Sequence, residues 1–150
     1  MRTLSKIILA SIFLAQTTAT WAQSASDREA VTLVMQTFIR SFEKSDLEVV
    51  RGITRADGSV VGYSTRQNQV VSQSIESWTK GFTGKPADDE AQRKRSFEIL
   101  DVSATGAVSK MLFDYPGWNG VDYIALSKID GKWMIISKSH SWKAKPAATQ

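Results

Sequence analysis

The stretch from Val121 to Lys138 constrains the fold most, because it has the pattern of two strands joined by a two-residue turn. Two runs rich in apolar and β-type residues flank Asp130-Gly131, and Asp-Gly favours a type I′ turn, whose two central residues both need positive φ. That turn sets the register of the hairpin. The expected cross-strand pairs are Leu126 with Ile135, Lys128 with Trp133, and Ile124 with Ser137.

Strand alternation divides this hairpin into two faces that both carry apolar side chains. The face expected to contact helices carries Asp122, Ile124, Leu126, Trp133 and Ile135. The opposite face carries Tyr123, Ala125, Ile129, Met134 and Ile136, with Lys132 and Lys138 among them. A hairpin with one solvated face would not need the second apolar set. We therefore expect a partner on the outer sheet face, and a twofold homodimer is the commonest arrangement.

Residues 1–22 have the three-part layout of a secretory signal peptide. A basic head with Arg2 and Lys6 precedes an apolar run over residues 7–15 and a small-residue stretch that ends at Ala22. The run is shorter than the roughly 20 residues that a membrane-spanning helix needs. We expect cleavage after Ala22, with Ala25 as the alternative site, and a periplasmic or secreted protein without a membrane anchor. A short anchoring helix is the competing interpretation.

The rest of the chain has the size of one domain, which we assign to residues 23–143, followed by a polar tail over residues 144–150. The sequence has no cysteine, so this domain must be stable without disulfide bonds. The formal charge of +4 falls by two when the signal peptide leaves. The one basic run, at 93–95, directly follows an acidic run at 88–90, which indicates a solvated loop. Nothing in the sequence predicts a nucleic-acid partner.

The order of expected elements indicates an α+β fold. Capping boxes at Ser26 and Ser45 predict helices that run to about Lys44 and to about Gly52. A turn at 56–58, strands at 59–63 and 70–71, and a third helix capped by Ser72 follow. Strands at 95–102 and 107–113, a turn-rich connection at 114–120 and the hairpin complete the domain. Helices gathered early and strands gathered late predict helices packed on one face of a curved antiparallel sheet.

On these residues the chain resembles the nuclear transport factor 2-like (NTF2-like) superfamily, and more narrowly the proteins named "putative lumazine-binding" or SnoaL-like. The likeness runs from the first helix (VMQTFIRSFEKSDLEVV), through EILDVSATGAVSKM, to VDYIALSKIDGKWMIISK. It implies a cone in which a strongly bent antiparallel sheet wraps around three helices from the N-terminal half. It also implies a cavity at the wide end of the cone and frequent dimerisation through the outer sheet face.

The resemblance argues against the chemistry of the superfamily's enzymes, such as steroid isomerases and scytalone dehydratase. Their first-helix tyrosine matches Phe38 here, and their first-strand carboxylate matches Gly62 or Tyr63. The family's closing histidine is displaced, because His140 comes one place early. His140 is the one histidine of the chain, without cysteine or carboxylates at ligand spacing, so we predict no metal site and no catalytic residue.

The candidate ligand-binding residues are aromatic side chains and one carboxylate: Phe38, Tyr63, Trp78, Tyr115, Trp118 and Asp122. Aromatic rings with a few polar groups are typical of small-molecule sites. Phe38 and Trp78 are at helical spacing and equally fit an ordinary core, whereas Trp118 lies in an expected loop. Asp122 either anchors a ligand or accepts structural hydrogen bonds, with Ser139 expected opposite. His140 is expected at the surface or the rim.

The resulting hypothesis is an exported domain that binds a small, largely apolar molecule in its cone, without catalysis and without a cofactor. Two alternatives stay open. One is an enzyme of the isomerase, cyclase or dehydratase kind that uses Asp122 with a tyrosine or His140. The other is an interaction domain whose cavity is filled by its own side chains.

Overall fold

The structure is a computed structural model that describes residues 25–65 and 68–146. A helix covers residues 25–44 and is followed by the short helix α2 (Leu47–Ile53). The remaining elements are, in chain order, β1 (Thr54–Ser64), β2 (Gln69–Ser74), α3 (Ile75–Thr79), the 3-10 helix η1 (Glu90–Gln92), β3 (Lys94–Val102), β4 (Gly106–Tyr115), β5 (Trp118–Ile129) and β6 (Lys132–Ala144). The expected signal peptide lies outside the described residues.

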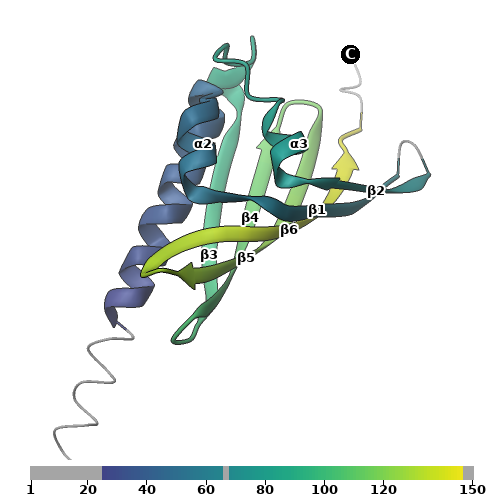
Figure 1. Ribbon diagram of the computed structural model, residues 1–150. Helices are drawn as coiled ribbons and strands as arrows, with labels where there is room; N and C mark the ends of the chain where they lie inside the picture. Colours follow the sequence, from purple (N-terminus) through teal and green to yellow (C-terminus); the bar gives the residue numbers. More distant parts are fainter. Residues whose placement is uncertain (1–24, 66–67, 147–150) are drawn as a thin grey trace, which may run out of the picture.

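The strands of the described residues form one six-stranded sheet in the order β2-β1-β6-β5-β4-β3. Its neighbours are antiparallel except for β1 and β6, which run parallel. The sheet curves around the helix of residues 25–44 and around α3, as Figure 1 shows. The α+β class and the cone around three helices are thus confirmed, with one parallel pair that we did not predict.

The turn of the central hairpin is as predicted, because Asp130 and Gly131 both have positive φ, of 50° and 79°. The pairs nearest the turn, Leu126 with Ile135 and Lys128 with Trp133, are confirmed.

The pairs beyond residue 135 are wrong by one residue. Ala125 pairs with Ser137 and Ile124 with Lys138, so that Ile136 is an extra residue in β6. Such a β-bulge moves every following side chain to the other face of the sheet. Asp122 therefore lies opposite His140 and not Ser139.

The bulge occurs at a close contact between β1 and β6. The register between these strands also shifts, between Thr54 and Ser59. A Cβ atom on Gly58 would lie 2.4 Å from the carbonyl oxygen of Ile136, so only glycine fits there without a rearrangement. Residues 56–58, which we predicted as a turn, instead belong to the irregular part of β1.

Several predicted element boundaries are wrong, and for α2 and α3 the reason is that a nearby polar residue is the cap. Asp46, and not Ser45, caps α2, and its carboxylate accepts a hydrogen bond from the Val49 amide at 3.0 Å. Ser74, and not Ser72, caps α3 in the same way. The first helix already includes Ser26. The expected loop at 114–120 is only a turn, since β5 begins at Trp118.

The core lies between the helices and the inner face of the sheet. Val31, Met35 and Phe38 from the first helix are fully buried. From the hairpin, Ile124 is fully buried and Ile135 almost fully.

The start of the first helix is attached to the hairpin through a buried carboxylate. Asp27 accepts hydrogen bonds from Lys128 Nζ at 2.6 Å and from Trp133 Nε1 at 3.2 Å. The opposite end of the sheet carries the candidate site.

Candidate functional site

A hollow of about 600 Å³ opens between the ends of β1, β2, β5 and β6 and the helix α3, and we call it the cone cavity. Its volume falls in the range of small-molecule sites. The residues that line it are Val60, Tyr63, Ser64, Thr65, Val71, Gln73, Trp78, Gly117, Trp118, Lys138, His140, Trp142 and Ala144. Three tryptophans, a lysine and the histidine therefore contribute to its lining.

Aromatic rings form a continuous row along this cavity. The ring centroid of Trp142 lies 5.1 Å from that of His140 and 5.1 Å from that of Trp118. Trp118 in turn packs on Tyr115 at 4.4 Å. On the helix side, Trp78 contacts Phe38 at 5.9 Å. Rings at these separations stabilise one another beyond simple burial, so they form a preformed wall of flat surfaces.

The polar centre of the cone cavity is an ion pair between Lys138 Nζ and Asp122 Oδ2. Both side chains are buried, with 6% and 1% of their side-chain surface exposed. Lys138 Nζ also lies 4.9 Å from the centroid of the Trp78 ring, which is a cation–π contact. The ammonium thus lies between a carboxylate and an aromatic face.

This ion pair is incompletely satisfied. Asp122 Oδ1 has no hydrogen-bond partner among the described residues. An ammonium has three N–H donors, and Lys138 uses one of them on Asp122. Buried polar groups normally have partners, so the remaining donors of Lys138, which lines the cavity, indicate a place for water or for a ligand.

Sequence reasoning missed Lys138, because we placed it on the outer face. The extra residue Ile136 turns Lys138 inward, onto the same face as Asp122. In a regular strand, Ile136 and Lys138 would lie on the same face, because they are two residues apart. The alternation pattern of β6 therefore contained no signal for the change of face.

His140 is two residues after Lys138 in β6, on the same face of the strand, and it also lines the cone cavity. Its ring rests against β1, where a Cβ atom on Gly62 would lie 2.5 Å from the ring. Burial lowers the pKa of His140, and the nearby charge of Lys138 lowers it further, while Asp122 acts in the opposite direction. The imidazole is therefore neutral near pH 7, and its place at the rim agrees with the predicted position.

The six residues proposed from sequence fall into two groups. Tyr63, Trp78 and Trp118 line the cone cavity. Phe38, Tyr115 and Asp122 lie behind its wall, with 0%, 3% and 1% of their surface exposed. Tyr63 is at the rim, half exposed, and its hydroxyl donates to Asn68 Oδ1 at 2.7 Å.

Tyr115 belongs to a polar cluster next to the cavity. Its hydroxyl accepts a hydrogen bond from Arg95 Nε at 2.6 Å, and Arg95 binds both carboxylate oxygens of Glu90. Burial raises the pKa of Tyr115. Because the groups of this cluster satisfy one another, its role is to hold the segment before β3 against the cone.

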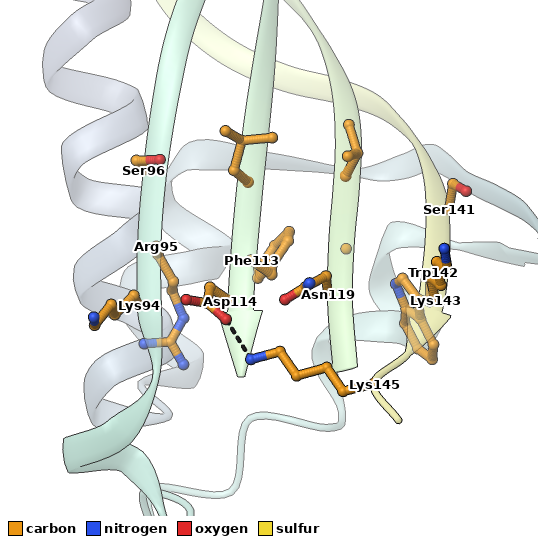
Figure 2. Close-up of a pocket in the computed structure, with 13 residues that line it drawn as sticks. Lys94, Arg95, Ser96, Phe113, Asp114, Asn119, Ser141, Trp142, Lys143 and Lys145 are labelled. Atoms are coloured by element: carbon orange, nitrogen blue, oxygen red, sulfur yellow. Dashed lines mark hydrogen bonds and ion pairs between the residues drawn. The ribbon is translucent and has the colours of Figure 1, made fainter. Parts of the chain in front are cut away.

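A second hollow, of about 870 Å³, lies on the outer face of the sheet, and we call it the outer groove. Figure 2 shows its side chains, which come from β3 to β6 and from the segment after β6. Lys145 Nζ and Asp114 Oδ1 form an ion pair of 2.5 Å across the ends of these strands. This pair is exposed, and the buried guanidinium of Arg95, which also lines the outer groove, is already bound to Tyr115 and Glu90. The cone cavity is therefore the better candidate site.

Two further observations concern the residues that the structure describes. No group of three or more potential ligands is arranged for a metal ion there. Within the same residues, no helix has the length and apolar character needed to cross a bilayer.

Residues 26–141 match the protein family described as "Putative lumazine-binding". This match covers more than half of the chain and includes every strand that lines the cone cavity, apart from the last residues of β6. No curated protein matches the chain.

Several solved structures are similar to this chain. An NTF2-like protein of unknown function from Shewanella baltica has 20% sequence identity over 82% of this chain and 97% of its own, with a TM-score of 0.67. An NTF2-like protein of unknown function from Methylobacillus flagellatus has 20% identity over 81% and 95%, with a TM-score of 0.68. The association domain of C. elegans CaMKII has 13% identity over 79% of this chain and 97% of its own, with a TM-score of 0.55. At these identities the likeness concerns the fold.

Proposed function

Because this chain belongs to the putative lumazine-binding family of NTF2-like domains, we propose that it binds a small, largely apolar molecule in its cone cavity. The observation that carries this proposal is the cavity itself. It holds about 600 Å³ that the protein's own side chains leave open, and it combines aromatic walls with Lys138, which is paired with Asp122 behind the wall. Apolar walls with a few convergent polar groups are typical of small-molecule sites.

The open volume argues against an interaction domain with a filled cone. A filled cone would bury the rings of Trp78 and Trp118 completely, whereas both are only partly buried and face the same hollow. The family description also favours a small ligand.

Two neighbouring valines on β2 provide a matched test. Val71 lines the cone cavity, whereas Val70 is 66% exposed and lies on the other side of the strand. Val71→Phe should fill part of the cavity and weaken binding of a flat apolar probe, 2-isopropylnaphthalene, measured by quenching of the cavity tryptophans. Val70→Phe should leave binding unchanged. Equal binding by both variants, or none by the wild-type protein, would refute the proposal.

An enzyme that uses His140 and Asp122 has one observation in its favour, because these residues lie opposite each other on β5 and β6. However, Asp122 binds Lys138, and no hydrogen bond among the described residues orients the imidazole. A general base needs such an orienting group. Binding without catalysis is therefore the better-supported function.

We also propose that the protein forms a homodimer through its outer sheet face. Val108, Leu112 and Tyr123 expose 40%, 43% and 50% of their surface on this face. A contiguous apolar patch on a sheet usually has a partner. For the N-terminal segment we propose export to the periplasm or the medium, on the three-part pattern of residues 1–22.

A further inference from the structure

Lys138 lacks acceptors for most of its donors, although it is one of the most buried charged groups of the described residues. Its ammonium carries three N–H groups, and one of them donates to Asp122. The ammonium also lies over the face of the Trp78 ring. No other described residue accepts from it. Lys138 is also one of the residues that line the cone cavity.

The charge balance of the cavity limits what this acceptor can be. Asp122 already neutralises Lys138, and burial keeps His140 neutral near pH 7. An anionic ligand would therefore bring a second, uncompensated negative charge next to Asp122. A cationic ligand would meet the ammonium of Lys138 at the aromatic face that it would need itself. Both charged classes incur a desolvation cost that nothing in the cavity offsets.

The walls limit the shape of the ligand. Trp118 and Trp142 lie 5.1 Å apart with their planes inclined by only 30°, and Trp78 contributes a further ring. Flat rings pack well on such surfaces.

We propose that the cone cavity selects an uncharged, flat aromatic molecule that carries a carbonyl oxygen, and that Lys138 donates a hydrogen bond to this oxygen. This inference rests on the proposed binding function and adds the ligand class. Asp122 has a positioning role, because it holds the ammonium in place and does not itself line the cavity.

The test uses three probes of nearly equal size: 2-acetylnaphthalene, 2-isopropylnaphthalene and 2-naphthoate. At pH 7.5 the wild-type protein should bind the ketone roughly ten- to hundred-fold more tightly than the hydrocarbon, which corresponds to one hydrogen bond to a charged donor. The naphthoate should bind more weakly than the ketone. Equal binding of ketone and hydrocarbon would overturn the proposal while leaving the binding function intact, and tighter binding of naphthoate would overturn the requirement for an uncharged ligand.

The variant that tests the donor removes both members of the ion pair, because a single substitution would leave a buried charge. Lys138→Met combined with Asp122→Asn should bind both neutral probes with similar affinity. Lys143→Met, an exposed lysine of the outer groove, is the control and should keep the preference. A preference for the ketone that survives in the double variant would refute the role of Lys138.

A second measurement does not depend on any variant. The infrared stretching frequency of the carbonyl of bound, carbon-13-labelled 2-acetylnaphthalene should be lower in the wild-type complex than in hexane, as expected for an oxygen that accepts from an ammonium. A frequency equal to that in hexane would contradict the proposed contact.

Discussion

The buried ion pair of Lys138 and Asp122 gives the sharpest test of how the cone is built. Both groups are almost completely removed from water, and Asp122 Oδ1 lacks a partner among the described residues. Removing one partner of such a pair leaves an uncompensated buried charge, which costs about 3–5 kcal/mol. That is a large part of the roughly 5–15 kcal/mol that stabilises a typical domain. Each of the substitutions Lys138→Met and Asp122→Asn should therefore destabilise the fold by this amount.

Combining the two substitutions should cost much less than their sum. The pair as a whole contributes little, because the cost of desolvating both ions offsets most of their attraction. We expect the double variant to be within about 2 kcal/mol of the wild-type protein. Chemical denaturation at 25 °C, followed by circular dichroism, measures all four free energies of unfolding in one cycle.

The exposed pair of Lys145 and Asp114 is the control cycle. Its side chains are 32% and 56% exposed, so each substitution there should cost less than about 1 kcal/mol. If the single substitutions at Lys138 and Asp122 also cost less than this, or if their effects simply add, the ion pair is not buried in the way that the structure shows and the argument fails.

Three further outcomes follow from the same protein. The folded-state pKa of His140 should lie below the ordinary histidine value of 6.5. The contribution of the neutral imidazole to the stability of the fold is then present above this pH and is lost as the pH falls through the folded pKa. An NMR titration of the imidazole that gives a pKa above 6.5 would contradict this. Tyr123→Lys should convert a dimer to a monomer in light scattering, whereas Leu33→Lys, on the similarly exposed side of the first helix, should not; a wild-type monomer at high concentration would refute dimerisation. Sequencing of protein from the periplasmic fraction should find Gln23 at the N-terminus, and an intact residue 1 would argue against cleavage.

The sequence predicted the fold because its signals are local and mutually consistent. Asp130-Gly131 defined the turn, and the pairs next to it followed from strand alternation. Helical spacing of Val31, Met35 and Phe38 predicted the buried face of the first helix. Capping was less predictable, since Ser45 and Asp46 are adjacent and both residue types favour the position before a helix.

The candidate site was predictable only in part, for a physical reason. Aromatic side chains indicated a cavity wall, and Trp118, in an expected loop, and Trp78, at helical spacing, do line the cone cavity. The polar centre depends instead on a contact between strands that are far apart in the chain, β1 and β6. No periodicity within β6 contains information about that contact.

The position of Lys138 illustrates this dependence on a distant residue. β1 lies so close to β6 at Gly58 that a Cβ atom there would collide with the Ile136 carbonyl, and the bulge at Ile136 occurs at this contact. The bulge reverses the faces of the rest of β6 and brings Lys138 and His140 into the cone. Gly58 thus permits the geometry of a binding site that it does not line. Gly58→Val should force β1 and β6 apart and weaken binding of 2-acetylnaphthalene, whereas Gly52→Val, where no atom lies within 4 Å of the new Cβ, should leave binding unchanged. If the two variants bound the ketone equally well, the bulge would not control the site.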